Sequence, residues 1–326
     1  TTVMFEEDHD FSQPGDTVFS MLGILDKVQD VVEKGVLLGE LRGDLVKPDP
    51  FVGTSSAWVD LTRFENLENA TFNRYRDYYA IVNNCNFYLE RADAEMERRG
   101  QKVFLKEYAA VSAYRAWAYL QLALLYGEVP FYTQPLLSYS EIEQVMNDPS
   151  KRKGLGEICS YFIDDLLPYV DVPFPNYGNF TYDQSSSVNS SDFFLPIRLL
   201  RGDLYLWRGS LDGNKSDFAK AAQEYRDYLL SEKRFVSPDV KVAYRTVDMD
   251  GAQIVDRWSS VFLGNNYNES ISLVPFAGNS QYGKLGSLRQ SFRSFMGSDA
   301  LQKLVDESYY CYVMYTEESE SGESEN

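Results

Sequence analysis

Residues 107–130 read EYAAVSAYRAWAYLQLALLYGEVP, an unbroken run of helix-forming residues that ends in a glycine and a proline. From residue 109 to residue 126 only one serine, one arginine and one glutamine are polar, so the predicted helix must be covered on nearly every side. The run approaches the length that spans a bilayer, but Arg115 near its middle and the polar flanks favour a helix buried in protein. Gly127 is typical of a left-handed helix stop, and Pro130 prevents the helix from resuming.

Periodic apolar residues predict further helices on both sides of this run. The clearest stripe, at alternating spacings of three and four, lies within residues 75–96 and comprises Tyr75, Tyr78, Val82, Cys85, Leu89, Ala92 and Met96. A helix predicted at residues 17–34 has an apolar face formed by Phe19, Leu22, Leu25, Val28 and Val32. Shorter patterns predict helices at residues 138–146, 154–169, 194–208 and 216–231.

Three asparagines, Asn83, Asn84 and Asn86, interrupt the otherwise strong helix pattern of residues 75–96. An amide near a buried helix face needs hydrogen-bond partners, and asparagine readily bonds to nearby backbone groups. We therefore expect these side chains to connect the helix to the backbone of a loop and not to contact a ligand.

The helices at residues 194–208 and 216–231 are joined by a tight turn of glycine and asparagine. Together they match the tetratricopeptide unit of about 34 residues in length and in the placement of small residues. Residues 107–169 resemble a second such pair with a longer connection. The predicted fold class is therefore mainly α, with a tetratricopeptide-like helical core, long loops and a few short strands.

The predicted organisation is a single domain over residues 1–326. A helical core covers about 17–232, a loop-rich part with short strands covers 233–310, and an acidic tail covers 317–326. Within these parts we expect irregular loops at residues 47–69 and 170–193, short strands at 240–244 and 269–275, and a further helix at 299–308.

The charge and histidine content exclude several classes of function. Lys and Arg total 31 against 49 Asp and Glu, and the resulting net charge of −18 repels phosphate backbones and anionic lipid headgroups. The single histidine, His9, excludes histidine-dependent triads and multi-histidine zinc sites. Three cysteines at wide spacing support neither a disulfide framework nor a metal site. We expect no nucleic acid, metal, cofactor or catalytic residue.

Aromatic residues carry the remaining functional signal. The chain has 24 Tyr, 20 Phe and 4 Trp, more than a helical core of this size needs, so some rings are expected on the surface, where they mark binding faces. Trp58, Tyr267 and Tyr282 lie in predicted loops and are candidates for stacking on the apolar faces of sugars. The alternative is that these rings pack back on the core.

Four motifs follow one another along the chain. They are Arg115-Ala-Trp-Ala-Tyr-Leu120, Tyr126-Gly-Glu-Val-Pro130, Ile163-Asp-Asp-Leu-Leu-Pro168 and Leu199-Leu-Arg-Gly-Asp-Leu-Tyr-Leu-Trp207. In this order they resemble the SusD/RagB family of Bacteroidetes outer-membrane lipoproteins, and the resemblance covers about residues 17–310. The Asp-x-Arg motif and the C-terminal signature typical of that family have no counterpart here, so the C-terminal portion of the family is expected to be missing.

The resemblance implies a cell-surface protein that binds a glycan or other nutrient and delivers it to a TonB-dependent SusC-like transporter, without catalysis. It also implies an outer-membrane location through an N-terminal lipid anchor that lies outside this sequence. The loop with Arg42, Asp44 and Trp58 falls in a region that often contributes to ligand binding in the family. Arg42 and Asp44 therefore join the candidate ligand-binding residues.

Two other functions remain open at this point. A helical-repeat scaffold that binds a peptide or a protein would be favoured by regular repeats with short connections, whereas this chain has long aromatic loops. A carboxylate glycosidase is the third possibility. Asp164 and Asp165, adjacent on a predicted helix, point in different directions, which is typical of a solvated face and not of a catalytic pair.

Overall fold

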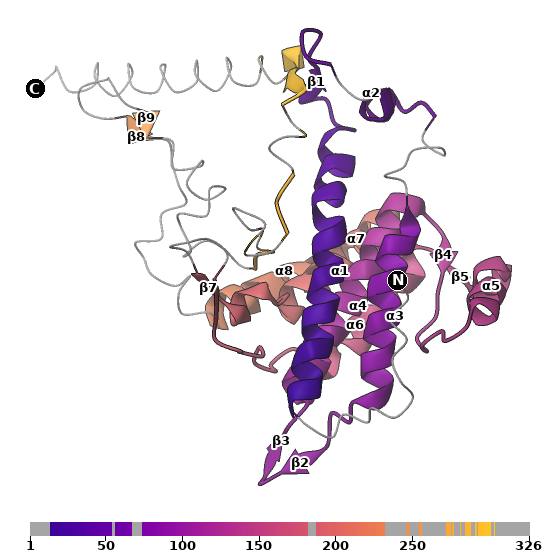
Figure 1. The fold of residues 1–326 in the computed structure, drawn as a ribbon, viewed down its shortest axis with the longest axis vertical. Coiled ribbons are helices and arrows are strands. Elements are labelled where there is room, and N and C mark those ends of the chain that lie inside the picture. Colours follow the sequence, from indigo (N-terminus) through magenta and orange to yellow (C-terminus); the bar gives the residue numbers. More distant parts are fainter. Residues whose placement is uncertain are drawn as a thin grey trace, which may run out of the picture. The chain divides into compact units, whose positions relative to one another are not determined.

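Helix α4 (Leu105–Tyr126) confirms the predicted central helix, and Figure 1 shows it among α3, α6 and α7. It is buried along most of its length because it has no polar face. The helix ends at Gly127, whose φ of 77° favours glycine. Its ψ of −128° lies outside the left-handed helical region, so the predicted left-handed stop is wrong. No helix in the part of the chain that the structure describes is long and apolar enough to span a membrane.

The computed structural model describes residues 14–53, 56–66, 74–181, 187–231, 246–247, 254–255, 272–274, 276, 281, 284–287, 291, 293–300 and 303. The chain divides into two compact units. The first comprises Thr1–Val28 and Tyr75–Pro275, and the second comprises Gln29–Arg74 and Phe276–Asn326. The predicted single domain stays a prediction, and the predicted acidic tail at residues 317–326 lies outside the described residues.

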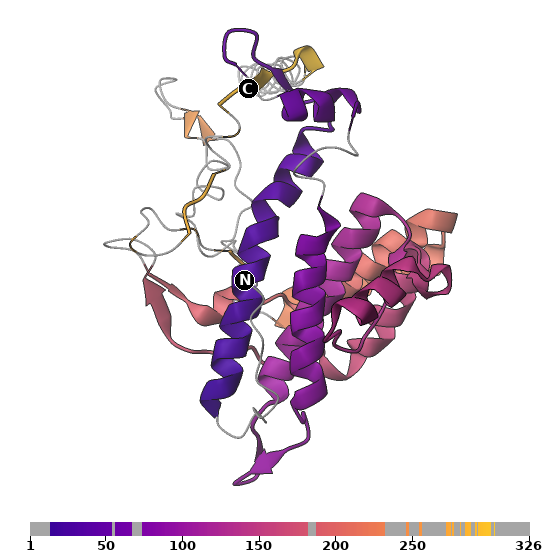
Figure 2. The same ribbon diagram turned by 45° about the vertical axis from the view of Figure 1, so that its right-hand side comes forward.

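In the first unit, successive long helices contact one another. α3 (Tyr75–Arg91) packs on α4, α4 on α6 (Leu155–Asp165), α6 on α7 (Ile197–Asp212), and α7 on α8 (Lys215–Ser231), as Figures 1 and 2 show. Short helix α5 (Tyr139–Asn147) and 3-10 turns at Pro149–Lys151, Leu167–Tyr169 and Ser190–Phe193 lie in the connections. The predicted mainly α fold is confirmed.

The strands of the described residues are short and pair two by two, all antiparallel. The pairs are β1 (Val46–Pro48) with β10 (Phe295–Gly297), β2 (Glu97–Arg98) with β3 (Gln101–Lys102), β4 (Val129–Pro130) with β5 (Arg152–Lys153), β6 (Asn179–Thr181) with β7 (Ser187–Asn189), and β8 (Thr246–Val247) with β9 (Ile254–Val255). The strand predicted at residues 240–244 lies outside the described residues, and residues 272–274 of the one predicted at 269–275 are not a strand.

The structure corrects the predicted N-terminal helix and the loop that follows it. α1 (Pro14–Glu40) extends past residues 17–34 in both directions, and its buried apolar residues are Met21, Ile24, Val28, Val31, Leu37 and Leu38. Of the predicted face only Val28 is buried, and Phe19 is 77% exposed. α1 has apolar residues around much of its circumference, so periodicity alone does not select the buried side. α2 (Ser56–Arg63) lies within the predicted loop 47–69.

Two asparagines of α3 bind the segment that follows α4. Asn83 donates from Nδ2 to the carbonyl of Leu136 (3.0 Å) and accepts from the backbone N–H of the same residue (2.8 Å). Asn86 donates to two carbonyl groups of this segment, at 3.3 and 3.2 Å. The predicted link between helix and loop is confirmed for both. It is wrong for Asn84, which donates to Ala80 O within its own helix (2.6 Å).

Arg115 is a buried cation within the helical array of the first unit. Its Nη1 donates to Asn86 Oδ1 (3.2 Å), and its Nη2 lies 3.1 Å from Asp165 Oδ2, with only 8% of the Arg115 side chain exposed. A buried charge is tolerated only when it is paired and hydrogen-bonded. Asp165 therefore has a structural partner inside the array, while the adjacent Asp164 is exposed.

A first test concerns Gly202 of α7, which packs against the ring of Tyr225 on α8. A Cβ atom there would lie 2.3 Å from the ring of Tyr225, whose hydroxyl donates to Asp203 Oδ1 at 2.6 Å. Because the ring must move and strain that bond, Gly202→Ala is expected to lower the free energy of unfolding by about 1–3 kcal/mol in a urea titration followed by circular dichroism.

The matched control is Gly23→Ala in α1, where an added Cβ meets nothing within 4 Å. Alanine there should raise the free energy of unfolding by up to about 1 kcal/mol, since it is the better helix former. Equal effects of the two substitutions would contradict the close approach of α7 and α8.

A second test uses the pH dependence of stability. Arg208 donates to Asp217 from Nε (2.7 Å) and Nη2 (2.8 Å), and these bonds hold the pKa of the buried Asp217 carboxyl below its ordinary value. A pKa that is lower in the folded state stabilises the fold above the unfolded-state pKa, and this stabilisation is lost as the pH falls through the folded-state pKa. Asp217→Asn should therefore lower the free energy of unfolding by about 2 kcal/mol at neutral pH.

The difference between the native protein and Asp217→Asn should begin to shrink as the pH drops below about 4, because the carboxyl of the unfolded chain takes up a proton there while that of the folded chain stays charged. The loss should be complete once the pH lies below the lowered folded-state pKa, where both side chains are uncharged. Asp164→Asn, on the exposed side of α6, is the control and should change little at any pH. A difference that is independent of pH would contradict the ion pair.

Candidate functional site

Arg42 and Asp44, two of the predicted ligand-binding residues, lie in the turn between α1 and β1 of the second unit. Arg42 is half-buried and its Nε donates to the Leu38 carbonyl (2.5 Å), so its guanidinium lies against the end of α1. Asp44 is exposed, and its carbonyl accepts a hydrogen bond from the Ser298 hydroxyl. The turn is also held by Ser298 N, which donates to Leu45 O (3.0 Å). Hydrogen bonds from Ser298, directly after β10, thus hold the backbone of Asp44 in position, and the Asp44 side chain is exposed to solvent.

Trp58 lies on α2 and not in a loop, which corrects the prediction for this residue. Its ring is half-buried, while Leu61 of the same helix is buried, so α2 presents one apolar side to the second unit. Figures 1 and 2 both show α2 beside β1, near the C-terminal end of α1. Arg42, Asp44 and Trp58 therefore belong to one compact unit, whereas Tyr267 and Tyr282 lie outside the described residues.

The same unit carries a strongly exposed ring that was not among the predicted residues. Phe51 is 94% exposed at the tip of the turn that follows β1. Asp49 fixes this turn, since its Oδ1 accepts from Phe51 N (2.8 Å) and its own N–H donates to Ser294 O (2.9 Å). The signal in the sequence was Asp49-Pro50, because an aspartate followed by proline commonly starts a turn that leaves the next side chain outside. Phe64, exposed and at φ 58°, ends α2.

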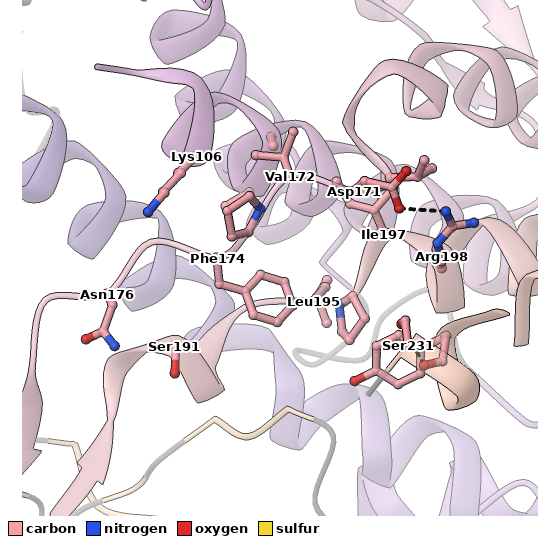
Figure 3. A pocket seen from close by; sticks show the side chains of 16 residues that line it. Lys106, Asp171, Val172, Phe174, Asn176, Ser191, Leu195, Ile197, Arg198 and Ser231 are labelled. Atoms are coloured by element: carbon pink, nitrogen blue, oxygen red, sulfur yellow. Dashed lines mark hydrogen bonds and ion pairs between the residues drawn. The ribbon is translucent and has the colours of Figure 1, made fainter. Parts of the chain in front are cut away.

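A separate pocket of about 480 Å³ lies in the first unit (Figure 3). It is formed by the first turns of α4 and α7, the end of α8 and the segment after α6. Its apolar wall consists of Val172, Pro173, Phe174, Leu195, Pro196 and Ile197. Phe174 is half-buried and packs against Phe194, with 6.2 Å between ring centroids. The volume falls in the range of small-molecule sites in proteins.

The polar groups of this pocket lie on opposite sides of Phe174. Figure 3 shows Lys106 and Asn176 on one side and the Asp171–Arg198 pair on the other. Arg198 Nη2 donates to Asp171 Oδ1 (2.6 Å) and Nη1 to Glu224 Oε2 (3.3 Å), and the bond with Asp171 raises the pKa of Arg198 above its ordinary value. The predicted irregular segment 170–193 supplies several of these residues. The sequence did not predict that this segment lies against the first turns of α4 and α7.

The described residues provide few groups for catalysis. They contain no cluster of three or more His, Cys, Asp or Glu side chains that could hold a metal ion. Cys85 and Cys159 are buried, and this burial raises the pKa of both thiols to about 12. A thiol with such a pKa is almost entirely protonated at neutral pH and is a poor nucleophile. The surfaces with exposed rings and hydrogen-bonding groups are suited to binding.

Comparison with solved structures shows the fold. No protein-family model matches this sequence, and no curated protein matches it. The chain is similar to a SusD superfamily protein from Bacteroides thetaiotaomicron VPI-5482, with a TM-score of 0.60 and 12% identity over 90% of this chain and 62% of that chain. It is similar to a SusD homolog from the same organism, with a TM-score of 0.52 and 16% identity over 84% and 55% of the two chains.

A third similar structure is the surface glycan-binding protein A from Bacteroides fluxus, with a TM-score of 0.50 and 14% identity over 68% of this chain and 45% of that chain. The chain spans about half the length of the solved structures it matches. The described part of the chain therefore has a SusD-like fold, and the fold implied by the sequence resemblance is confirmed.

The burial of the two cysteines gives a direct test. With Cys311 replaced by serine, the native protein is expected to release no chromophore from Ellman's reagent at about pH 8, because roughly one thiol in ten thousand is ionised and both are enclosed. In concentrated guanidinium chloride both thiols should react. Rapid reaction of the native protein would show an accessible thiolate and reopen thiol chemistry.

Proposed function

We propose that this chain is a member of the SusD superfamily that binds a glycan at the bacterial cell surface. The observation that carries the proposal is the likeness to a solved SusD superfamily structure over 90% of this chain, at a TM-score of 0.60. The similar protein from Bacteroides fluxus is named as a surface glycan-binding protein, which supports a glycan as the ligand class.

The proposed contact surface is the part of the second unit around Trp58, Phe51, Arg42 and Asp44. An aromatic ring offers an apolar face on which the C–H side of a pyranose stacks. Phe51 is exposed and is anchored through its backbone N–H, so its ring is available without a change in the fold. Asp44 supplies an exposed carboxylate that accepts hydrogen bonds from hydroxyl groups. Tyr267 and Tyr282 remain predicted ligand-binding residues.

Delivery of the ligand to a TonB-dependent SusC-like transporter is part of the proposal, as is attachment to the outer membrane by an N-terminal lipid anchor. Both rest on the family resemblance. A pull-down from solubilised outer membranes with the tagged chain should recover a SusC-like transporter. Its absence from the recovered proteins would remove the delivery step and leave glycan binding standing.

The proposed function is binding without catalysis. The two adjacent carboxylates considered for a glycosidase have different surroundings. Asp165 forms an ion pair with Arg115 at 3.1 Å, whereas Asp164 is exposed on α6. A retaining or inverting glycosidase needs two carboxyl groups that face one bond from opposite sides. This arrangement supports a structural role for Asp165.

Affinity electrophoresis tests the proposal. Native gels cast with soluble polysaccharides should retard the protein in at least one case. Phe51→Ala and Trp58→Ala should each weaken the interaction about fivefold or more, since a stacked ring contributes about 1 kcal/mol or more. Phe51→Ala leaves the fold intact because the ring is 94% exposed, so its effect reports on binding alone.

Tyr139→Ala is the matched control, because this ring is 77% exposed on α5, which belongs to the first unit and is no part of the proposed surface. It should leave the retardation unchanged. If no polysaccharide retards the protein, or if the Tyr139 and Phe51 variants behave alike, the proposed surface is wrong. Release of reducing ends from a polysaccharide would instead establish an enzyme.

A further inference from the structure

The pocket of the first unit has unpaired hydrogen-bond donors at one end and an ion pair at the other. This contrast indicates the chemical class of ligand that the pocket binds. The inference rests on the proposed glycan-binding function and concerns a subsite apart from Trp58 and Phe51. Lys106 and Asn176 lie on one side of Phe174, and Asp171 with Arg198 lies on the other (Figure 3).

At the end with Lys106 and Asn176, the polar groups that these two side chains leave for a ligand are hydrogen-bond donors. Asn176 Oδ1 accepts from Gly178 N (2.9 Å), which orients the amide and leaves its NH₂ group for a ligand. Lysine has three donors and no acceptor, and among the described residues no carboxylate forms an ion pair with Lys106. Donors of this kind, one of them charged, select an anionic acceptor such as a carboxylate.

The opposite end is already neutralised by the protein. Arg198 lies 2.6 Å from Asp171, 3.3 Å from Glu224 and 3.9 Å from Asp227, so its charge is satisfied without a ligand. The Asp171 side chain is 80% exposed and keeps one oxygen for a hydroxyl group. This end therefore suits the hydroxyl groups of a ligand and not a second anion.

Between the two ends, the apolar wall offers Phe174 and two prolines as a surface for the C–H face of a sugar ring. The pocket volume of about 480 Å³ leaves room for such a ligand with its flanking groups. The formal net charge of the chain is −18, so a patch of unpaired donors runs against the prevailing charge. We infer that the pocket binds a sugar residue that carries a carboxylate, with the carboxylate at Lys106 and Asn176 and the ring against Phe174.

Calorimetry with defined acidic sugars tests this inference. The probes are trigalacturonic acid and trimannuronic acid, each compared with its methyl ester, which keeps the sugar skeleton and removes the charge. At least one acid should bind more tightly than its ester. Lys106→Met should lower the affinity for that acid about threefold to fivefold, as expected for an exposed ion pair, and leave the ester unchanged.

Asn176→Asp is the sharper variant, because an aspartate also accepts the Gly178 N–H bond and thus keeps the turn, while it replaces the amide donors by a negative charge. It should weaken binding of the acid about tenfold or more without affecting the ester. Lys151→Met, at an exposed lysine outside the pocket, controls for the loss of one positive charge and should change nothing.

Equal affinity for acid and ester, failure of both acids to bind, or equal effects of Lys106→Met and Lys151→Met would each overturn the inference. Any of these results leaves the proposed function standing if a polysaccharide still binds and still depends on Phe51 and Trp58. Loss of all glycan binding, in the gels as in the calorimeter, would overturn both.

Discussion

The burial of α4 is the constraint on which the first unit depends. A helix with almost no polar side chains cannot leave a face in water, so α3, α6 and α7 cover it and a strand pair follows directly at its end. The Tyr119 hydroxyl shows how the cover is fixed. It donates to Tyr132 O (2.7 Å) and accepts from Tyr132 N (2.9 Å), so one buried side chain satisfies both backbone groups of the returning chain. Its ring packs on Phe131 and Phe162, with 4.7 and 5.6 Å between centroids.

The few polar groups inside the array form links between elements far apart in sequence. Asn86 on α3, Arg115 on α4 and Asp165 on α6 make one chain of hydrogen bonds, and each member would be costly to bury alone. Asn83 fixes the segment after α4 in the same way. These side chains set the register of α3, α4 and α6 more narrowly than apolar packing does, because a hydrogen bond requires a defined distance and direction.

The two candidate binding surfaces would hold a ligand through different interactions. The surface of the second unit presents aromatic rings, and the backbone of its turns is held by Asp49 and by the β1–β10 pair. The pocket of the first unit is enclosed by helix ends and combines an apolar wall with donors on one side and a paired carboxylate on the other. The pocket takes Lys106 and Arg198 from the first turns of α4 and α7, and Trp58 of the other surface lies on α2. The array therefore acts as a scaffold, and its helix ends, together with α2 and the segments between helices, carry the recognition chemistry.

The sequence by itself determined the central helix, the α7–α8 pair and the mainly α class, because the 3.6-residue period of a buried helix is written directly in its apolar residues. The predicted stripe at residues 75–96 is buried on α3 from Tyr78 to Leu89, whereas Tyr75 is exposed and Met96 lies beyond the end of the helix. The sequence also predicted that Asn83 and Asn86 bond to loop backbone, but it did not separate them from Asn84, which bonds within its own helix. Only the tertiary structure decided which side of α1 is buried, that Trp58 lies on a helix of eight residues, and that Phe51 is exposed. Only the tertiary structure brought Lys106 to Phe174 and Arg198. The physical reason is that periodicity is a local property, whereas burial, exposure and a pocket depend on which distant segments come to lie against a residue.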